Sequence, residues 1–242
     1  MTADLDRRQF IEAAGLAAAS LAIPVGLAVG AAQAQTSPEQ GKIPMPYEIK
    51  PMPFEPSHIK GMSEKILVSH YENNYSGAVK RLNAIEAQLA GLDWATAPTF
   101  LVNGLKREEL IAANSMILHE HFFNAIGGDG QPTGALQEAI KRDFGGVERW
   151  RAEFSAMGKA EGGGSGWVIL AYSPRDKQLI NCWAADHTTT LAGGRPVLVL
   201  DMYEHAYHMD YGARAGAYVD AFMQNIRWDG AASLYTRYSG ES

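Results

Sequence analysis

Residues 201–211, with the sequence DMYEHAYHMDY, constrain the fold more than any other part of the chain. They contain carboxylates and two histidines, and the apolar run 197–200 comes directly before them. Such a run is typical of a buried segment, and a titratable group taken out of water needs a hydrogen-bond partner or a metal ion. The rest of the chain must therefore bring either a polar network or further metal ligands to this segment.

The composition indicates a globular protein and limits the kind of metal site. The chain has 242 residues, 46% of them hydrophobic and 20% charged, which is enough for one large domain or two small ones. A net charge of −6 argues against a nucleic-acid-binding protein and gives no reason to expect attraction to an anionic membrane. The single cysteine, Cys182, excludes an internal disulfide and a cysteine-ligated cluster. Metal ligands must therefore come from His, Asp and Glu.

The first 34 residues have the pattern of an export leader. Arg7 and Arg8 form a twin arginine, an apolar stretch rich in alanine follows, and the segment ends in the small-residue sequence Ala-Gln-Ala at 32–34. This pattern predicts a twin-arginine signal peptide over residues 1–34, of the kind that exports folded proteins. We therefore expect a periplasmic or secreted protein with no stable membrane association after cleavage. The alternative is an N-terminal membrane anchor, although glycine and alanine make the stretch only weakly hydrophobic.

The chain after the leader predicts an α+β fold that begins with helices. Residues 35–57 hold six of the eleven prolines and predict an extended arm. Apolar residues at helical spacing predict one long helix from Ser63 to Leu89 and a second from about Arg107 to Ile126. Two long helices joined by a loop predict an αα-hairpin, which forms an N-terminal domain over residues 58–130.

The remaining pattern predicts a C-terminal α+β domain over residues 131–230. Two shorter helices are expected over 134–145 and 146–161. Three apolar runs with strand-like spacing, at 165–174, 178–187 and 195–204, predict a small three-stranded antiparallel sheet in the order of a meander. A last helix over about 216–228 flanks the sheet, and residues 231–242 read as a polar tail that frays.

Four titratable side chains are predicted to face inward together. His70 and His119 lie on the apolar stripes of the two long helices, where each alone is more simply a hydrogen-bonded core histidine. Asp201 ends the third strand run and His205 follows at i+4, so the two share a face if a helix begins there. Asp201 alone could be a helix cap. Together the four form a nitrogen and oxygen site suited to iron, manganese or zinc.

Several segments of the chain resemble motifs of one known protein family. The sequence DMYEHAYHMDY closely resembles the Asp-x-Trp-Glu-His-Ala-Tyr-x-x-Asp-Tyr signature of the iron/manganese superoxide dismutases. Residues 69–83 and 112–123 are similar to the helices that carry that family's first two metal ligands, and 162–172 to the Gly-Ser-Gly-Trp entry to its sheet. The resemblance covers residues from about 43 to 230, and the four motifs occur in the family's order.

The resemblance implies a superoxide dismutase with one Fe or Mn ion per subunit and a water or hydroxide as fifth ligand. Its metal ligands would be the four side chains named above: His70, His119, Asp201 and His205. His187 takes the position of a family Gln or His that hydrogen-bonds the metal-bound solvent, and Ser115 fills the alternative position. We also predict a catalytic role for Tyr207, which matches an aromatic residue around the site. Glu204 matches a glutamate that crosses a dimer interface, so a homodimer is expected.

Other positions depart from the family's pattern. The gateway His, Tyr and Arg of the family are replaced by Asn74, Ala78 and Ala215, and Tyr203 replaces the usual Trp. Tyr75, His121 and His208 are candidates to replace the gateway groups in space. The departures leave two alternatives: a metal-binding protein of this fold with weak or no dismutase activity, or a different metal-dependent oxidoreductase that uses the room at Ala78.

Overall fold

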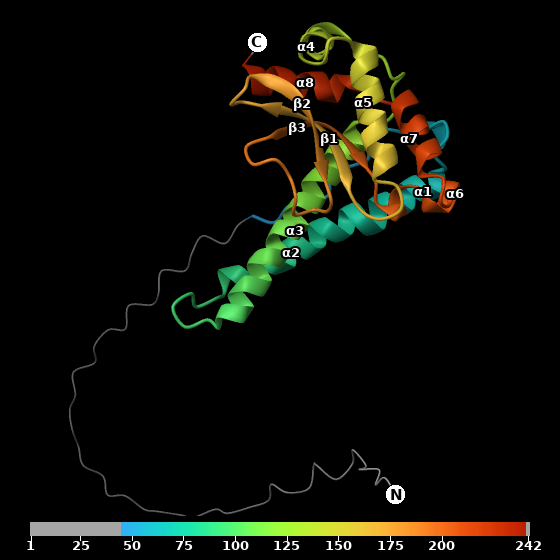
Figure 1. The fold of residues 1–242 in the computed structure, drawn as a ribbon. Helices are drawn as coiled ribbons and strands as arrows, with labels where there is room; N and C mark the ends of the chain where they lie inside the picture. Colours follow the sequence, from blue (N-terminus) through green and yellow to red (C-terminus); the bar gives the residue numbers. More distant parts are fainter. Residues whose placement is uncertain (1–44, 241–242) are drawn as a thin grey trace, which may run out of the picture. The chain divides into compact units, whose positions relative to one another are not determined.

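The computed structural model describes residues 45–240, so the predicted signal peptide and the start of the arm lie outside the described residues. Residues 45–55 contain no helix or strand before the short 3-10 helix η1 (Pro56–His58). The described residues belong to one compact unit, in which a pair of long helices projects from a body of helices and strands (Figure 1). No helix among residues 45–240 is both long and apolar enough to cross a membrane.

The first long helix is built from three consecutive segments. These are α1 (Glu64–Ser69), the π-helix η2 (His70–Tyr75) and α2 (Ser76–Ala90). Ser63 caps the start, because its side chain accepts a hydrogen bond from the Ile66 N–H at 3.2 Å. A π-helix inserts an extra residue into the turn and is frequently found at functional sites. Here it begins at His70.

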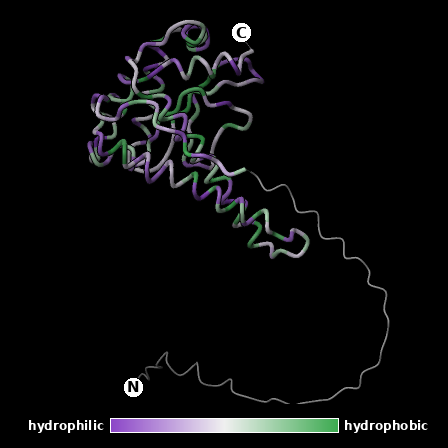
Figure 2. Tube along the Cα trace, turned by 180° about the vertical axis from the view of Figure 1, so that it is seen from behind, coloured by the Kyte–Doolittle hydropathy of each residue, from purple (hydrophilic) through white to green (hydrophobic). Residues whose placement is uncertain are grey.

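The second helix, α3 (Thr99–Asn124), packs against α2 and confirms the predicted hairpin. Its predicted start near Arg107 is wrong, because the helix begins at Thr99 directly after Pro98. Phe100 is 79% exposed in the first turn, so the apolar residues there do not form a buried stripe and the periodicity misses this turn. Figure 2 shows hydrophobic and hydrophilic positions alternating along these helices, as expected when only one face is buried.

The C-terminal part contains helices and a three-stranded antiparallel sheet, which confirms the predicted α+β fold. Helices α4 (Gly134–Phe144) and α5 (Val147–Ala160) precede strands β1 (Trp167–Ser173), β2 (Gln178–Ala184) and β3 (Arg195–Asp201). The strand order is β2-β1-β3, so the predicted meander is wrong. β1 is buried along its whole length and therefore takes the centre. Its pairing with β3 places Trp167 opposite Asp201.

Two helices, one packed on α5 and one on strands of the sheet, end the described chain and correct the predicted tail. After η3 (Glu204–Ala206) and α6 (His208–Tyr211) come α7 (Ala215–Gln224) and α8 (Trp228–Ser239). Residues 231–239 therefore belong to a helix and are not a frayed tail. The reason is one apolar stripe, formed by Trp228, Ala231 and Tyr235, which is buried. The Tyr235 ring packs on Tyr172 of β1 with a centroid distance of 6.0 Å.

Candidate metal centre

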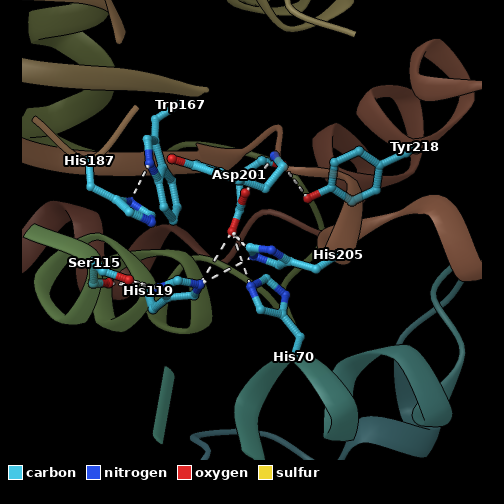
Figure 3. Close-up of polar contacts among 9 residues, drawn as sticks. His70, Ser115, His119, Trp167, His187, Asp201, His205 and Tyr218 are labelled. Atoms are coloured by element: carbon cyan, nitrogen blue, oxygen red, sulfur yellow. Dashed lines mark hydrogen bonds and ion pairs between the residues drawn. The ribbon is translucent and has the colours of Figure 1, made fainter. Parts of the chain in front are cut away.

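The structure brings the four predicted metal ligands together. His70 begins η2, His119 lies in α3, Asp201 ends β3 and His205 lies in η3. One ligand atom from each side chain lies within 4.8 Å of the other three. Figure 3 shows the imidazole rings and the carboxylate pointing toward one another. The expectation that Asp201 and His205 share a helical face is wrong, because Asp201 closes a strand and His205 sits in a 3-10 turn.

The distances describe a tight cluster around one carboxylate oxygen. Asp201 Oδ2 lies 3.1 Å from His70 Nε2, 3.2 Å from His205 Nε2 and 3.5 Å from His119 Nε2. The Nε2 atoms of His119 and His205 are also 3.5 Å apart. His70, His119 and Asp201 are at most 1% exposed, whereas the His205 side chain is 26% exposed. Solvent therefore reaches the cluster on the side of His205.

Hydrogen bonds outside the cluster fix two of its members. The Nδ1–H of His119 donates to the backbone oxygen of Ser115 at 2.6 Å, which leaves a lone pair on Nε2 directed at the cluster. The Oδ1 atom of Asp201 accepts from the Tyr203 N–H at 2.8 Å, and the Tyr218 hydroxyl donates to the Asp201 backbone oxygen at 2.8 Å. Oδ2 therefore remains for the cluster. Outer hydrogen bonds of this kind orient metal ligands.

Burial and charge set the protonation states that a metal requires. Burial lowers the pKa of His70, and it lowers the pKa of His119 to about 3 together with the neighbouring His70. Burial raises the pKa of Asp201, but His205 and His70 lower it further, so the carboxyl pKa is well below its usual range. The buried imidazoles are thus neutral and the carboxylate is ionised near neutral pH, the forms in which these side chains bind metals.

The donor set fits a metal ion. His70 Nε2 is buried and makes no hydrogen bond of acceptable geometry, although Asp201 Oδ2 is 3.1 Å away. The Nε2 atoms of His119 and His205 lie 3.5 Å apart, and the His119 Nε2 lone pair points into the cluster because Nδ1–H is bound to Ser115. A cation between these atoms would satisfy all of them at once. Three neutral imidazoles and one carboxylate suit iron and manganese.

Comparisons with known proteins agree with this site. The family described as "Iron/manganese superoxide dismutases, C-terminal domain" matches residues 132–234. The chain is 69% identical over 191 residues to "Superoxide dismutase [Fe]" of Cupriavidus metallidurans, and the match covers 79% of this chain and 97% of that relative. This chain belongs to the iron/manganese superoxide dismutase family.

More distant relatives carry both metals in their names. The chain is 36% identical over 197 residues to "Superoxide dismutase [Mn] 2" of Haloferax volcanii, covering 79% of this chain and 96% of that relative. It is 34% identical over 184 residues to "Superoxide dismutase [Fe]" of Aquifex pyrophilus, covering 73% of this chain and 85% of that relative. Together with the four-residue cluster, these relatives indicate one Fe or Mn ion per subunit.

An aromatic layer surrounds the cluster and includes His187. Trp167 donates its Nε1–H to His187 Nδ1 at 3.1 Å, so the proton of a neutral His187 lies on Nε2. The His187 ring is 6.2 Å from the His119 ring. Tyr203 stacks between His187, at 4.7 Å, and His205, at 5.3 Å. The replacement for the family's Trp therefore keeps an aromatic contact with a predicted metal ligand.

Tyr207 is not among the residues that gather at the cluster. It is 1% exposed, its hydroxyl accepts from the Gly163 N–H at 3.2 Å, and its ring stacks on Tyr218 at 5.3 Å. Tyr218 in turn binds the Asp201 backbone. A direct catalytic role for Tyr207 stays a prediction. Tyr218 itself was missed by sequence reasoning, and its only signal was a hydroxyl-bearing aromatic on the apolar face of the last predicted helix.

The gateway positions carry no ionisable side chain, and the proposed substitutes do not reach the cluster. Ala78 and Ala215 are buried, at 7% and 6% exposure. The Tyr75 hydroxyl is bound to Lys50 and Glu120. Neither His121 nor His208 makes a hydrogen bond or ion pair to the four predicted ligands within residues 45–240, and His208 is exposed.

Proposed function

We propose that this protein is a superoxide dismutase that converts superoxide to hydrogen peroxide and dioxygen at a single Fe or Mn ion. The observation that carries the proposal is the cluster of His70, His119, Asp201 and His205 in a chain that is 69% identical to a superoxide dismutase. Iron is the metal we favour, because that relative is named for iron while the relative named for manganese is 36% identical.

The residues of the chain would hold the metal and prepare the site for an anion. The bound metal would supply one-electron exchange with two successive superoxide ions. Asp201 contributes one negative charge and the imidazoles contribute none, so the liganded centre keeps a net positive charge that attracts superoxide. His187 would donate its Nε2–H to solvent at the centre, because Trp167 occupies Nδ1. The exposed side of His205 gives the anion its approach.

A second candidate is a metal-binding protein of the same family with weak or no dismutase activity. Alanine at positions 78 and 215 favours this candidate, since neither side chain can relay a proton or attract an anion. The two candidates differ in one measurement. Purified protein with about one Fe or Mn per chain and rapid dismutation supports the first, whereas a metal-loaded protein without dismutation supports the second.

Substitution of the central carboxylate tests the ligand assignment. Asp201→Ala should yield protein with little metal, because the only anionic donor of the cluster is lost. Asp220→Ala is the matched control, since Asp220 is an exposed carboxylate on α7. Metal content is measured on both variants after the same purification. Full metal retention in Asp201→Ala would refute the assignment.

We also propose that the chain is exported in a folded state and forms a homodimer. Arg7 and Arg8 support export, and replacing both with lysine should keep the protein inside the cell.

Glu204 supports the dimer, because it is exposed in the single chain and precedes the predicted ligand His205. Glu204→Gln should weaken the dimer in sedimentation measurements. A monomeric unmodified protein would overturn this part of the proposal.

A further inference from the structure

Lys50, in the arm, is bound through three of its groups to the two helices that supply the first metal ligands. Its backbone N–H donates to the Tyr75 hydroxyl at 2.9 Å, and its backbone oxygen accepts from the Tyr71 hydroxyl at 2.6 Å. Its ammonium group forms an ion pair with Glu120. Tyr71 and Tyr75 lie on η2 and Glu120 lies on α3. One arm residue therefore joins both helices.

The contact between the helices is closed by Tyr75. Its hydroxyl accepts from Lys50 and also donates to Glu120 Oε1 at 3.2 Å. Tyr75 is 2% exposed and the Glu120 side chain is 17% exposed, so water competes weakly for this hydrogen bond. Burial and the charge of Glu120 raise the pKa of Tyr75 to about 12, although the hydrogen bond from the Lys50 N–H lowers it in part. The hydroxyl therefore keeps the proton that it donates.

These contacts lie directly behind two predicted metal ligands. His70 and Tyr75 are the first and last residues of η2, and Glu120 follows His119 in α3. The Phe123 ring of α3 packs against both His70 and Tyr75, with centroid distances of 5.1 Å and 6.2 Å. A shift of η2 relative to α3 would therefore move the His70 and His119 rings relative to each other.

We propose that Lys50, Tyr75 and Glu120 are positioning residues, which hold η2 against α3 and so keep His70 and His119 at the spacing that the metal needs. Their side chains make no hydrogen bond or ion pair to the four predicted ligand side chains; they bond to one another instead. Their effect is to keep the donor atoms in place before the metal binds and to slow their separation afterward. The inference rests on the metal centre of the proposed function.

The chain offers a matched control in a second attachment of the arm. Asn83 of α2 binds both backbone groups of Tyr47, since its Oδ1 accepts from the Tyr47 N–H at 2.8 Å and its Nδ2 donates to the Tyr47 oxygen at 2.9 Å. Asn83 attaches the same arm to the same long helix, about two turns beyond Tyr75. Among residues 45–240 its side chain makes no hydrogen bond to α3. We expect the loss of these two bonds to loosen the arm and to leave the pairing of η2 with α3 intact.

The test is the rate at which the purified, metal-containing full chain releases its metal to an excess of chelator. Tyr75→Phe keeps the ring and removes only the hydroxyl, and we expect release about 10-fold faster than in the unmodified protein, the lower end of the effects measured for residues that orient metal ligands. Lys50→Met removes the ion pair but keeps the backbone hydrogen bonds to Tyr71 and Tyr75, so it should accelerate release less, about 3-fold. Asn83→Ala should stay within about 2-fold.

Two results would overturn the inference. One is release from Tyr75→Phe at the unmodified rate. The other is an equal acceleration in Asn83→Ala, which would show that general attachment of the arm matters and not the Tyr75 and Glu120 contact. Circular dichroism of each variant verifies that it is folded, and Lys50→Met carries the test if Tyr75→Phe does not fold. Because the readout is metal release, a protein that behaves as expected but does not dismutate superoxide refutes the proposed activity alone.

Discussion

Glu161 is a buried carboxyl group, and we predict that it destabilises the protein at neutral pH. It is 9% exposed at the end of α5, and neither carboxylate oxygen has a hydrogen-bond partner of good geometry among residues 45–240, although the Ala184 backbone lies nearby. A negative charge at a helix C-terminus is also unfavourable. Burial raises the pKa of Glu161 to about 8; the Ala184 backbone offsets part of this rise and the charge of Asp201 adds to it. We predict that Glu161→Gln stabilises the protein.

The magnitude follows from the difference between the folded and unfolded states. The ordinary pKa of 4.5 applies to the unfolded chain, so between pH 4.5 and about 8 the unfolded chain has released this proton while the folded chain retains it. The contribution of Glu161 to the free energy of unfolding is therefore complete below pH 4.5 and falls as the pH rises to about 8. At pH 7 the loss is about 3 kcal/mol, because each pH unit contributes about 1.4 kcal/mol.

The assay is urea or thermal unfolding of both proteins, with equal metal content, at several pH values. At pH 7 Glu161→Gln should be more stable by about 3 kcal/mol and melt about 6–12 °C higher, and the difference should vanish near pH 4.5. Glu148→Gln, an exposed substitution in the first turn of the same helix, should not show this pH trend. A Glu161→Gln variant that is less stable at pH 7 would refute the reasoning, because it would mean that the carboxylate has a partner.

Further substitutions and one change of condition test the surroundings of the site and two glycines elsewhere in the fold. Tyr218→Phe leaves the buried Asp201 backbone oxygen without its 2.8 Å donor and should lower the unfolding free energy by about 1–3 kcal/mol in urea titrations. The free energy of unfolding of the metal-free protein should fall by about 2 kcal/mol between pH 6.5 and 5 because of His119. The pKa of His119 is about 3 in the folded state, so the unfolded chain takes up the proton first as the pH falls. His119→Gln should remove this pH dependence. Gly104→Ala should raise the melting temperature slightly, because open space surrounds the new methyl group in a helix. Gly128→Ala should lower the melting temperature by several degrees, because its methyl group meets the backbone of Ile226 and Arg227.

The sequence predicted the inward-facing residues because periodicity reports which face of an element is buried. The apolar stripes identified His70 and His119, and both are buried in the structure. The apolar run before Asp201 likewise marked a buried strand end, and Asp201 is fully buried. These two stripes, the strand end and the spacing of His205 four residues after Asp201 predicted the cluster, although they could not show how closely the four side chains approach one another.

Other features had no local signal in the sequence. The order β2-β1-β3 depends on which strand is covered on both faces, and that depends on the surrounding helices. The π-helical segment at His70 contains neither glycine nor proline, so its residues read as ordinary helix. The first turns of α3 expose Phe100, which hides their helical period. Each of these features depends on tertiary packing, which the hydrophobic periodicity of a single segment does not reveal.

The positions of the four predicted ligands along the chain also bear on the order of events during synthesis. His70, His119 and His205 belong to three separate elements, and the carboxylate joins them only when β3 has paired with the central strand β1. Contacts between residues so far apart in sequence form late in folding. A ribosome must therefore complete nearly the whole chain before an ion can meet all four donors, and a chain truncated within β3 would emerge without a carboxylate to hold it.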